Sequence, residues 1–448
     1  MKKTGEVSMA RVYISFLGTN DYVECFYDSD TIDVETPVRF IQETTLSLFS
    51  KTASSDDRGF IFITDEARRK NWEDNGQWDR EKKCNKACQG LKTRIDLLKL
   101  PFPVEAVFIP EGHSEKEIWD IFDIVYCVLN EGDDVIFDIT HAFRSIPMLA
   151  IVILNYARVL KNIRLEGIYY GAFEALGPAW EVARMPVQKR RAPLLNLISF
   201  NRLMEWTVAV DRFMESGDAK EVSRLARDAV APVLKESRGK DKSASATRDI
   251  ANALAFFTKN LYTCRGPEIV RSAEYLKCEL NKAIHAEGVK PLVPLFDHIR
   301  QGVSRFRGDD VHDGIQAAKW CLDHNLIQQG FTVLQETLIT YFVTMNGQNA
   351  NDLVYRNIAS SAIWIAKDGT PENEWHGHAQ KNKILTKQYI AISKAMEPLS
   401  DIYRELTPFR NDLAHAGYRD NCKKAEKFEE KLRESLPKIA ALIQLNPL

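Results

Sequence analysis

Between residues 11 and 172, apolar residues form short continuous runs, and stretches with helical spacing lie between them. The runs are rich in β-branched and aromatic residues, which is typical of strands. Because they are apolar at nearly every position, we expect strands buried on both faces, as in a parallel sheet. The predicted strands cover residues 11–18, 22–27, 59–64, 104–110, 133–140 and 163–172.

The intervening segments have apolar residues three and four positions apart, which predicts helices. Pro37 suits the first turn of a helix over residues 37–50. Ser114 and Glu117 have the spacing of a capping box, at the start of a helix that ends near Gly132. Strands that alternate with helices of this length imply right-handed βαβ units. The other predicted helices cover residues 65–72 and 146–162.

After about residue 195 the strand pattern stops and helical spacing continues to the C-terminus, beginning with a helix over residues 194–217. Two polar segments interrupt it, and we expect an exposed loop at 236–249 and a partly helical insertion at 346–383. The predicted fold is an α/β domain with a mostly parallel, Rossmann-like sheet, followed by an all-α region. The predicted domains are a sheet domain at 1–195, a helical linker region at 196–305 and a helical domain at 306–448.

Composition agrees with a globular protein, with 45% hydrophobic and 27% charged residues. The net charge of −2 gives no overall basic field for nucleic acid, although a local basic groove would suffice for RNA. Eight cysteines without a CxxC pair predict reduced thiols in a cytoplasmic protein. No window approaches the roughly 18 apolar residues of a membrane span, so we expect no membrane association.

A first candidate site lies in the loop after the strand at 133–140, where the sequence reads FDITHAFRSIP. Thr140, His141, Arg144 and Ser145 carry donors that suit phosphate and ribose oxygens. Loops at the carboxyl ends of parallel strands form the ligand crevice of such sheets. The loop after the first strand, LGTNDY, would form a second wall and the end of IYYGAF a third.

Two alternatives bear on this loop. It could be an ordinary strand-to-helix turn capped by Asp138, and spacing leaves that alternative open. The dinucleotide fingerprint GxGxxG is absent and no acidic ribose partner is evident, which disfavours an NAD-dependent dehydrogenase.

A second candidate site is the segment TPFRNDLAHAG near the C-terminus. Thr407 can cap a helix, Pro408 fits its first turn and Gly417 can end it, which predicts a short helix. Asn411 and His415 are four residues apart and therefore share a face.

Arg410 would then lie near the positive end of this helix, where it could meet a phosphate. A histidine that moves a proton and an arginine that stabilises phosphorane-like charge suit RNA cleavage by the strand's own 2′-hydroxyl, with no metal required. One helix does not aim Arg410 and His415 at one point, so two copies across a two-fold axis, a homodimer, are implied. The alternative is a surface helix with a solvated arginine. His376 and His378 lack acidic or cysteine partners, and we read them as loop residues rather than metal ligands.

Four stretches together resemble the CRISPR-associated CARF–HEPN ribonucleases of type III systems, accessory effectors of the Csx and Csm type. The segments ISFLGTNDYVECFY, DVIFDITHAFRSIPMLA and IYYGAFEA resemble the ligand-sensing CARF domain of that family. The segment FRNDLAHAGY resembles its HEPN ribonuclease motif. On this resemblance, residues 1–195 are a CARF domain and residues 306–448 a HEPN domain.

The resemblance implies a ribonuclease that cleaves single-stranded RNA without metal and is activated allosterically by a cyclic oligoadenylate, most often the tetraadenylate. It also implies a homodimer or higher even oligomer with the ligand bound across two CARF domains. By position, the catalytic residues would be Arg410, Asn411 and His415. The ligand pocket would be lined by Gly18, Thr19, Asn20, Thr140, His141, Phe143, Arg144 and Ser145.

Two other hypotheses stay open on the sequence. One is a ligand-sensing transcriptional regulator or other non-catalytic binding module, although the helical region shows no clear recognition helix. The other is that the sheet domain cleaves the cyclic ligand itself, with His141 and Arg144 as candidates. The segment 346–383 would lie near the catalytic groove and change access to it.

Overall fold

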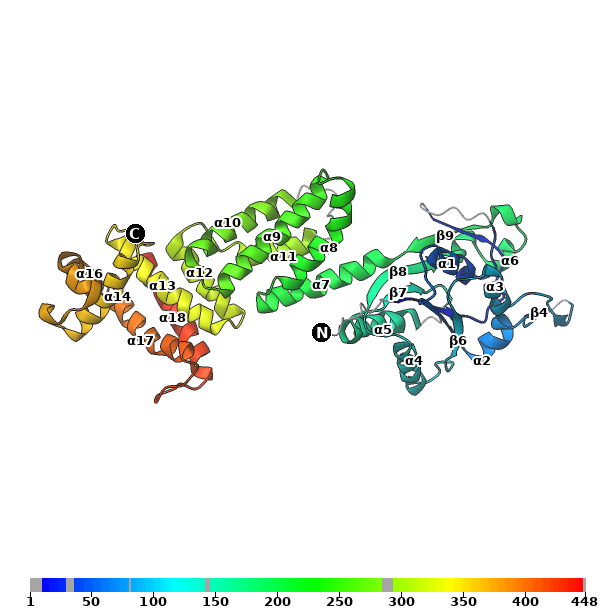
Figure 1. Ribbon diagram of the computed structural model, residues 1–448, viewed down its shortest axis with the longest axis horizontal. Helices are drawn as coiled ribbons and strands as arrows, with labels where there is room; N and C mark the ends of the chain where they lie inside the picture. The colour runs from blue at the N-terminus through cyan, green and yellow to red at the C-terminus, as the bar shows by residue number, and fades with distance from the viewer. Residues whose placement is uncertain (1–9, 30–35, 80–81, 142–145, 284–292, 446–448) are drawn as a thin grey trace, which may run out of the picture. The chain divides into compact units, whose positions relative to one another are not determined.

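The chain folds as two units, residues 1–202 and 203–448. The computed structural model describes residues 10–29, 36–79, 82–141, 146–283 and 293–445. Figure 1 shows the strands gathered in the first unit and helices alone in the second. The predicted order, a mostly parallel α/β sheet followed by a long helical region, is confirmed.

The first unit is built on a seven-stranded sheet in the order β2-β9-β8-β7-β1-β3-β6. Strands β8, β7, β1, β3 and β6 pair in parallel, whereas β9 runs antiparallel to β8 and carries β2 at the edge. A separate two-stranded hairpin is formed by β4 and β5. The strands are β1 Arg11–Leu17, β2 Phe26–Asp28, β3 Arg58–Ile63, β4 Trp78–Asp79, β5 Cys84–Asn85, β6 Val104–Phe108, β7 Asp134–Asp138, β8 Arg164–Gly171 and β9 Arg191–Asn196.

Helices cover both faces of this sheet, which explains the continuous apolar runs. On β1, Val12, Ile14 and Phe16 pack toward α4 and α5, and Tyr13 and Leu17 pack toward α1 and α3. The helices of this unit are α1 Ile41–Ser50, α2 Asp65–Ala67, a π-helical turn Arg68–Trp72, α3 Leu91–Leu98, α4 Glu115–Cys127, α5 Ile146–Lys161, α6 Ala179–Val182, and 3₁₀ turns at Phe173–Leu176 and Val187–Lys189.

The second unit is helical throughout its described residues and has one large apolar core. The centre of this core includes Trp320 of α12 and Phe331 and Tyr341 of α13, each nearly inaccessible to solvent. The helices are α7 Ile198–Ser216, α8 Lys220–Glu236, α9 Lys242–Tyr262, α10 Gly266–Ala283, α11 Val293–Val303, α12 Asp310–Asp323, α13 Ile327–Met345, α14 Leu353–Asp368, a 3₁₀ turn Glu372–Glu374, α15 Gly377–Lys381, α16 Lys383–Ala395, α17 Glu397–Ala414 and α18 Glu426–Leu445.

Several predicted boundaries were wrong. The helix expected from Pro37 begins at Ile41, because Val38 is held in a bridge to Cys25, and the helix expected to end near Gly132 ends at Cys127. The start of the predicted helix at 194–217 belongs instead to strand β9, in which Leu194 is buried against β8.

Both polar segments of the helical region contain helix, which was expected for 346–383 but not for 236–249. Most of the loop expected at 236–249 is the first part of α9, which begins at Lys242 with Asp241 as its cap. The segment 346–383 is largely helical, and α14 places Ile358, Ala362 and Ile363 in the core of the unit. It is therefore an integral part of the core.

Three helices run through a proline: α8 through Pro232, α17 through Pro408 and α18 through Pro437, of which only Pro408 was expected at a helix start. All three prolines are exposed. On the solvent face, water can bond the carbonyl that loses its N–H partner, so the helix continues.

The division at Arg202 lies near the predicted end of the sheet domain at 195, and the finer boundary at 305 stays a prediction. None of the helices in the described part of the chain is long and apolar enough to cross a membrane.

Candidate functional sites

The first candidate site lies at the carboxyl ends of β1 and β7. Strands β3 and β6 lie on one side of β1, and β7, β8 and β9 lie on the other, so the sheet extends in both directions from β1. In open α/β sheets, ligands bind outside the strand ends at such a point. The register pairs Ser15 of β1 with Asp138 of β7, so the two following loops start side by side.

The loop after β1 is held by side-chain amides that bond its carbonyl groups. Asn71 Nδ2 donates to the carbonyl oxygens of Gly18 (2.9 Å) and Asn20 (2.8 Å). Gln77 Nε2 donates to Asn20 O (3.2 Å) and to Asn71 Oδ1 (2.8 Å), and it lies 3.4 Å from Thr19 O. With these carbonyls occupied, the loop has a fixed backbone before any ligand arrives.

The loops after β1 and β7 touch each other at Gly18. A Cβ at this position would collide with the hydroxyl of Tyr22 and lie only 3.2 Å from the carbonyl oxygen of His141. The Tyr22 and His141 rings are 4.1 Å apart between centroids and are tilted by 32°. The structure thus brings together the sequence-predicted residues Gly18 and His141.

His141 is an uncharged side chain in this arrangement. Burial lowers the pKa of His141 from its usual 6.5 to about 3, because the charged imidazolium would lose its hydration. Its Nε2 atom has no hydrogen-bond partner among the described residues. The ring therefore carries no positive charge, and its buried Nε2 atom is an unsatisfied hydrogen-bonding group.

Asp138 anchors the start of the second loop. Its Oδ1 accepts from the backbone N–H of Thr140 (3.0 Å), and its Oδ2 accepts from the hydroxyls of Tyr13 (3.2 Å) and Thr45 (3.1 Å). Burial raises the pKa of the Asp138 carboxyl, and these bonds oppose that shift. Thr140 Oγ1 accepts from the N–H of Gly171 (2.9 Å), so the Thr140 side chain ties β7 to the end of β8.

Asp138 therefore caps the turn after β7, as one of the alternatives proposed. The loops after β1 and β7 also meet at the strand ends. Thr19 and Asn20 are placed in the first loop. Phe143, Arg144 and Ser145 lie outside the described residues.

The second candidate site lies at the end of α17, and its helix differs from the prediction. Pro408 lies inside α17, and Thr407 is no N-cap, because its Oγ1 donates to Tyr403 O (2.9 Å) and accepts from Gln335 Nε2 (2.7 Å). Arg410 therefore lies near the C-terminal, negative end of the helix dipole, and the expectation of a positive helix end was wrong. The helix ends at Ala414, and the N–H of Gly417 (φ 75°) bonds back to Asp412 O (3.1 Å).

The three predicted catalytic residues share the last turn and a half of α17. His415 is the C-cap residue and is exposed, whereas Arg410 and Asn411 are half-buried. Asn411 Oδ1 accepts from Arg410 Nη1 (3.2 Å), so this amide orients the guanidinium. Among the described residues the His415 ring has no hydrogen bond, which leaves it free to meet another molecule.

A buried carboxylate fixes the loop that follows His415. Asp412 Oδ2 accepts from the backbone N–H of Lys423 (2.7 Å), and its Oδ1 is buried without a partner among the described residues. The Lys423 ammonium lies 4.6 Å from the centre of the Phe409 ring. The loop closed in this way carries Arg419 and Asp420, and Lys424 follows it, so with Lys423 the segment is net positive and can offset the negative helix end for an approaching phosphate.

The helix itself is held by aromatic packing. The Phe409 ring stacks on Phe331 of α13 (5.7 Å between centroids, 6°) and meets Phe428 of α18 edge-on (5.6 Å, 89°). The Tyr403 hydroxyl lies 2.9 Å from Ser360 Oγ of α14. Arg410 and His415 thus extend from a helix whose opposite face is firmly packed.

Comparison with known proteins was made for the whole chain. The chain is similar to a CRISPR-associated protein. This protein, MJ1674 of Methanocaldococcus jannaschii, is 25% identical over 327 residues, and the match covers 71% of this chain and 43% of that protein. The chain therefore spans less than half the length of this relative. No family model matches the chain.

Sequence reasoning missed four residues that shape these sites. Asn71 and Gln77 lie far along the chain from the loop that they hold, so no local pattern marks them. Tyr22 and Asp412 stand inside the quoted segments, but their roles depend on three-dimensional contacts. Within the described chain, no group of three or more metal-ligating side chains is gathered in one place, and His376 and His378 are exposed around the start of α15.

Proposed function

We propose that this protein is a CARF–HEPN endoribonuclease of type III CRISPR antiviral defence, activated by a cyclic oligoadenylate such as cyclic tetraadenylate. Its substrate is single-stranded RNA, and cleavage needs no metal. The similarity to a CRISPR-associated protein supports the CRISPR role. The observation that carries the nuclease assignment is the end of α17, where an exposed histidine and an amide-oriented arginine follow a packed helix.

The proposed reaction uses the 2′-hydroxyl of the RNA as nucleophile. It attacks the adjacent phosphorus, the bond to the 5′-oxygen breaks, and the products are a 2′,3′-cyclic phosphate and a 5′-hydroxyl. His415 moves the proton between these oxygens, and Arg410 stabilises the additional negative charge on the phosphate oxygens. Asn411 is a positioning residue in this scheme, because its amide oxygen bonds Arg410.

The proposed activator binds in the crevice between the loops after β1 and β7. The loop at residues 18–20, which Asn71 and Gln77 hold in place, and the uncharged His141 favour a ligand held by hydrogen bonds and stacking rather than by a positive charge. Activation requires that the ligand bind the active state of the protein more tightly than the inactive state.

A homodimer completes both sites in this proposal. Helix α5 directly follows the ligand loop and exposes Val152, Tyr156, Val159 and Leu160, with 48–70% of each residue accessible. An apolar surface of this kind is unusual on a monomer and supports contact with a second copy of the chain. In such a dimer, two copies of α17 would supply paired Arg410 and His415 side chains.

The decisive experiment mixes purified protein with single-stranded RNA in EDTA, with and without cyclic tetraadenylate. We expect cleavage only with the ligand, and its loss in His415→Ala. The matched control is His378→Ala, an exposed histidine of α15, which should cleave as the wild type does. Cleavage that persists in His415→Ala rejects the catalytic assignment, and activation that persists in Arg144→Ala rejects the ligand site.

A further inference from the structure

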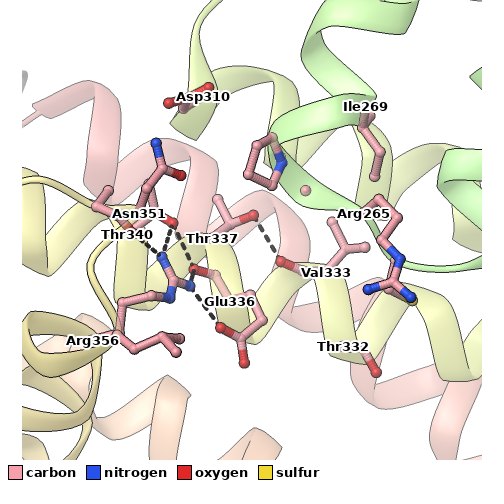
Figure 2. A pocket seen from close by; sticks show the side chains of 16 residues that line it. Arg265, Ile269, Asp310, Thr332, Val333, Glu336, Thr337, Thr340, Asn351 and Arg356 are labelled. Carbon is pink, nitrogen blue, oxygen red and sulfur yellow. Dashed lines mark hydrogen bonds and ion pairs between the residues drawn. The ribbon is translucent and has the colours of Figure 1, made fainter.

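The helical unit contains a pocket that neither candidate site uses. It has a volume of about 430 Å³ and lies among the first turn of α10, the start of α12, the middle of α13 and the start of α14. Figure 2 shows Arg265 and Arg356 on two sides of it, with Glu336 and Thr337 between them. This volume falls in the range of pockets that hold small organic ligands.

One of the two arginines is part of the wall. Arg356 Nη2 pairs with Glu336 Oε2 (2.6 Å) and bonds Glu336 O (2.9 Å), and its Nη1 bonds Thr340 Oγ1 and Ala350 O (both 2.9 Å). The guanidinium is therefore occupied. These bonds leave Glu336 Oε1 as an acceptor that has no partner in the described chain.

The other polar groups of the pocket remain available to a ligand. The Arg265 guanidinium is exposed and has no partner in the described chain, and the same holds for the Asp310 carboxylate and the Asn351 amide. Two arginines and two carboxylates make the lining neutral overall. A neutral lining disfavours a polyphosphate and suits a ligand with a single anionic group and several hydrogen-bond donors.

Apolar side chains form the rest of the lining. Ile269 and Val333 are buried at its floor, Pro267 presents its ring, and Leu353 stands at the rim with 73% of its surface exposed. Flat apolar contacts next to hydrogen-bonding edges are what a heterocyclic base requires.

We propose that this pocket binds one nucleotide whose base carries an exocyclic amino group. The base lies against Pro267, Ile269 and Val333, its amino group donates to Glu336 Oε1, and its phosphate meets Arg265. Uracil has no exocyclic amino group, and its N3–H lies between two carbonyl oxygens that a carboxylate repels, so the pocket disfavours it.

Two sources can supply this nucleotide, a free mononucleotide or a residue of an RNA strand. The second rests on the proposed ribonuclease function, and the first does not. One contact links α17 to the helix that carries a wall of the pocket: the Tyr403 hydroxyl of α17 lies 2.9 Å from Ser360 Oγ of α14, and α14 also carries Arg356.

The test is calorimetric titration of the full-length protein with GMP, AMP, CMP and UMP. We expect the three amino-bearing nucleotides to bind at least about tenfold more tightly than UMP, and Arg265→Gln to weaken binding by about tenfold or more. Leu353→Trp, which fills the pocket from its exposed rim, should abolish binding. The matched control Arg271→Gln removes an exposed arginine of α10 outside the pocket and should leave affinity unchanged.

Binding unaffected by both Arg265→Gln and Leu353→Trp would place the nucleotide elsewhere and overturn the proposal. Equal affinity for UMP would overturn the role of Glu336.

Short guanosine- and uridine-containing RNAs, titrated into the His415→Ala variant, separate the two sources. If RNA binds tightly and needs Arg265 while no mononucleotide binds, the pocket belongs to an RNA strand. If neither RNA nor a mononucleotide binds, the proposal is rejected. A ribonuclease that cleaves RNA normally but binds no nucleotide here retains the proposed function and loses only this inference.

Discussion

The two candidate sites are built in opposite ways. The loops at the ends of β1 and β7 form a buried frame, in which Asn71, Gln77 and Asp138 hold backbone groups before any ligand binds. The end of α17 presents an exposed histidine with no side-chain partner in the described chain. Only its neighbour Arg410 is oriented, by a single amide.

The difference indicates where each site gets its geometry. A preorganised frame lowers the cost of ordering a ligand and suits recognition. An exposed helix end does not fix an imidazole, so a productive geometry must come from another surface, such as RNA or a second copy of the chain.

His415→Ala should lower ligand-stimulated RNA cleavage by roughly 10²- to 10⁴-fold, because a proton-transfer group is lost. Its melting temperature should equal that of the wild type, since the side chain is exposed. Initial rates with a labelled RNA and a thermal melt measure the two quantities. A large loss of stability would mean that this helix end is a structural frame like the crevice, and the contrast would fail.

Asn71→Ala should have the opposite profile. It leaves the carbonyls of Gly18 and Asn20 and the amide of Gln77 with fewer partners, and we expect the free energy of unfolding to fall by about 2–4 kcal/mol. Affinity for the cyclic ligand should fall, while cleavage at saturating ligand persists. Asn85→Ala, an exposed asparagine of β5, is the control, and urea denaturation is the measurement. Wild-type stability in Asn71→Ala would show that the frame does not depend on this amide.

Stability of the sheet unit should depend on pH through His141. Its pKa is about 3 when folded and near 6.5 when unfolded, so below pH 6.5 the unfolded chain binds a proton that the folded chain does not. Stability from this group is complete above pH 6.5 and is lost as the pH falls, by up to about 1.4 kcal/mol per pH unit.

His141→Gln should remove this slope, and His113→Gln, at an exposed position in the same unit, should retain it. Asp138 contributes with the opposite sign, because burial raises its pKa and its contribution falls as the pH rises. The Asp138 contribution is the same in the wild type and in the variants. The difference between their slopes of unfolding free energy against pH therefore measures His141 alone. Urea denaturation at pH 7 and pH 5 gives the comparison, and equal slopes in wild type and His141→Gln would contradict it.

Pro408→Ala should have the smallest effect. It restores an N–H inside α17, and we expect stability to rise by about 1 kcal/mol or less, with cleavage unchanged. A helix that began at Pro408 would instead lose a favourable first residue. A clear loss of stability in a thermal melt would therefore favour the short helix and return Arg410 to a positive helix end.

Much of the sheet unit could be predicted because its signals are local. Apolar runs such as that of β1 mark buried strands, and the meeting of two loops follows from a parallel sheet that extends both ways from its first strand. Strand β9 was missed because its short run, with Pro193 inside it, reads as the start of a helix. Asn71 and Gln77 were missed because their partners are about fifty residues away along the chain.

The helical unit was harder to predict for a different reason. Pro408 is a strong local signal for a helix start, but packing of α17 against α13 and α18 outweighs it. The spacing of Arg410, Asn411 and His415 could be read from the sequence. Their position at the negative end of the dipole of α17 could not. The clamp between Asp412 and the Lys423 backbone could not be foreseen, since it depends on how the chain turns after Gly417.

The close approach at Gly18 has a consequence for natural variation. Tyr22 cannot easily move away, because its ring lies between His141 and Phe40. Any side chain at position 18 would separate the two loops, whereas Thr19 and Asn20 contribute mainly carbonyl groups to this frame. Among orthologues that retain these two loops, position 18 should therefore be invariant as glycine.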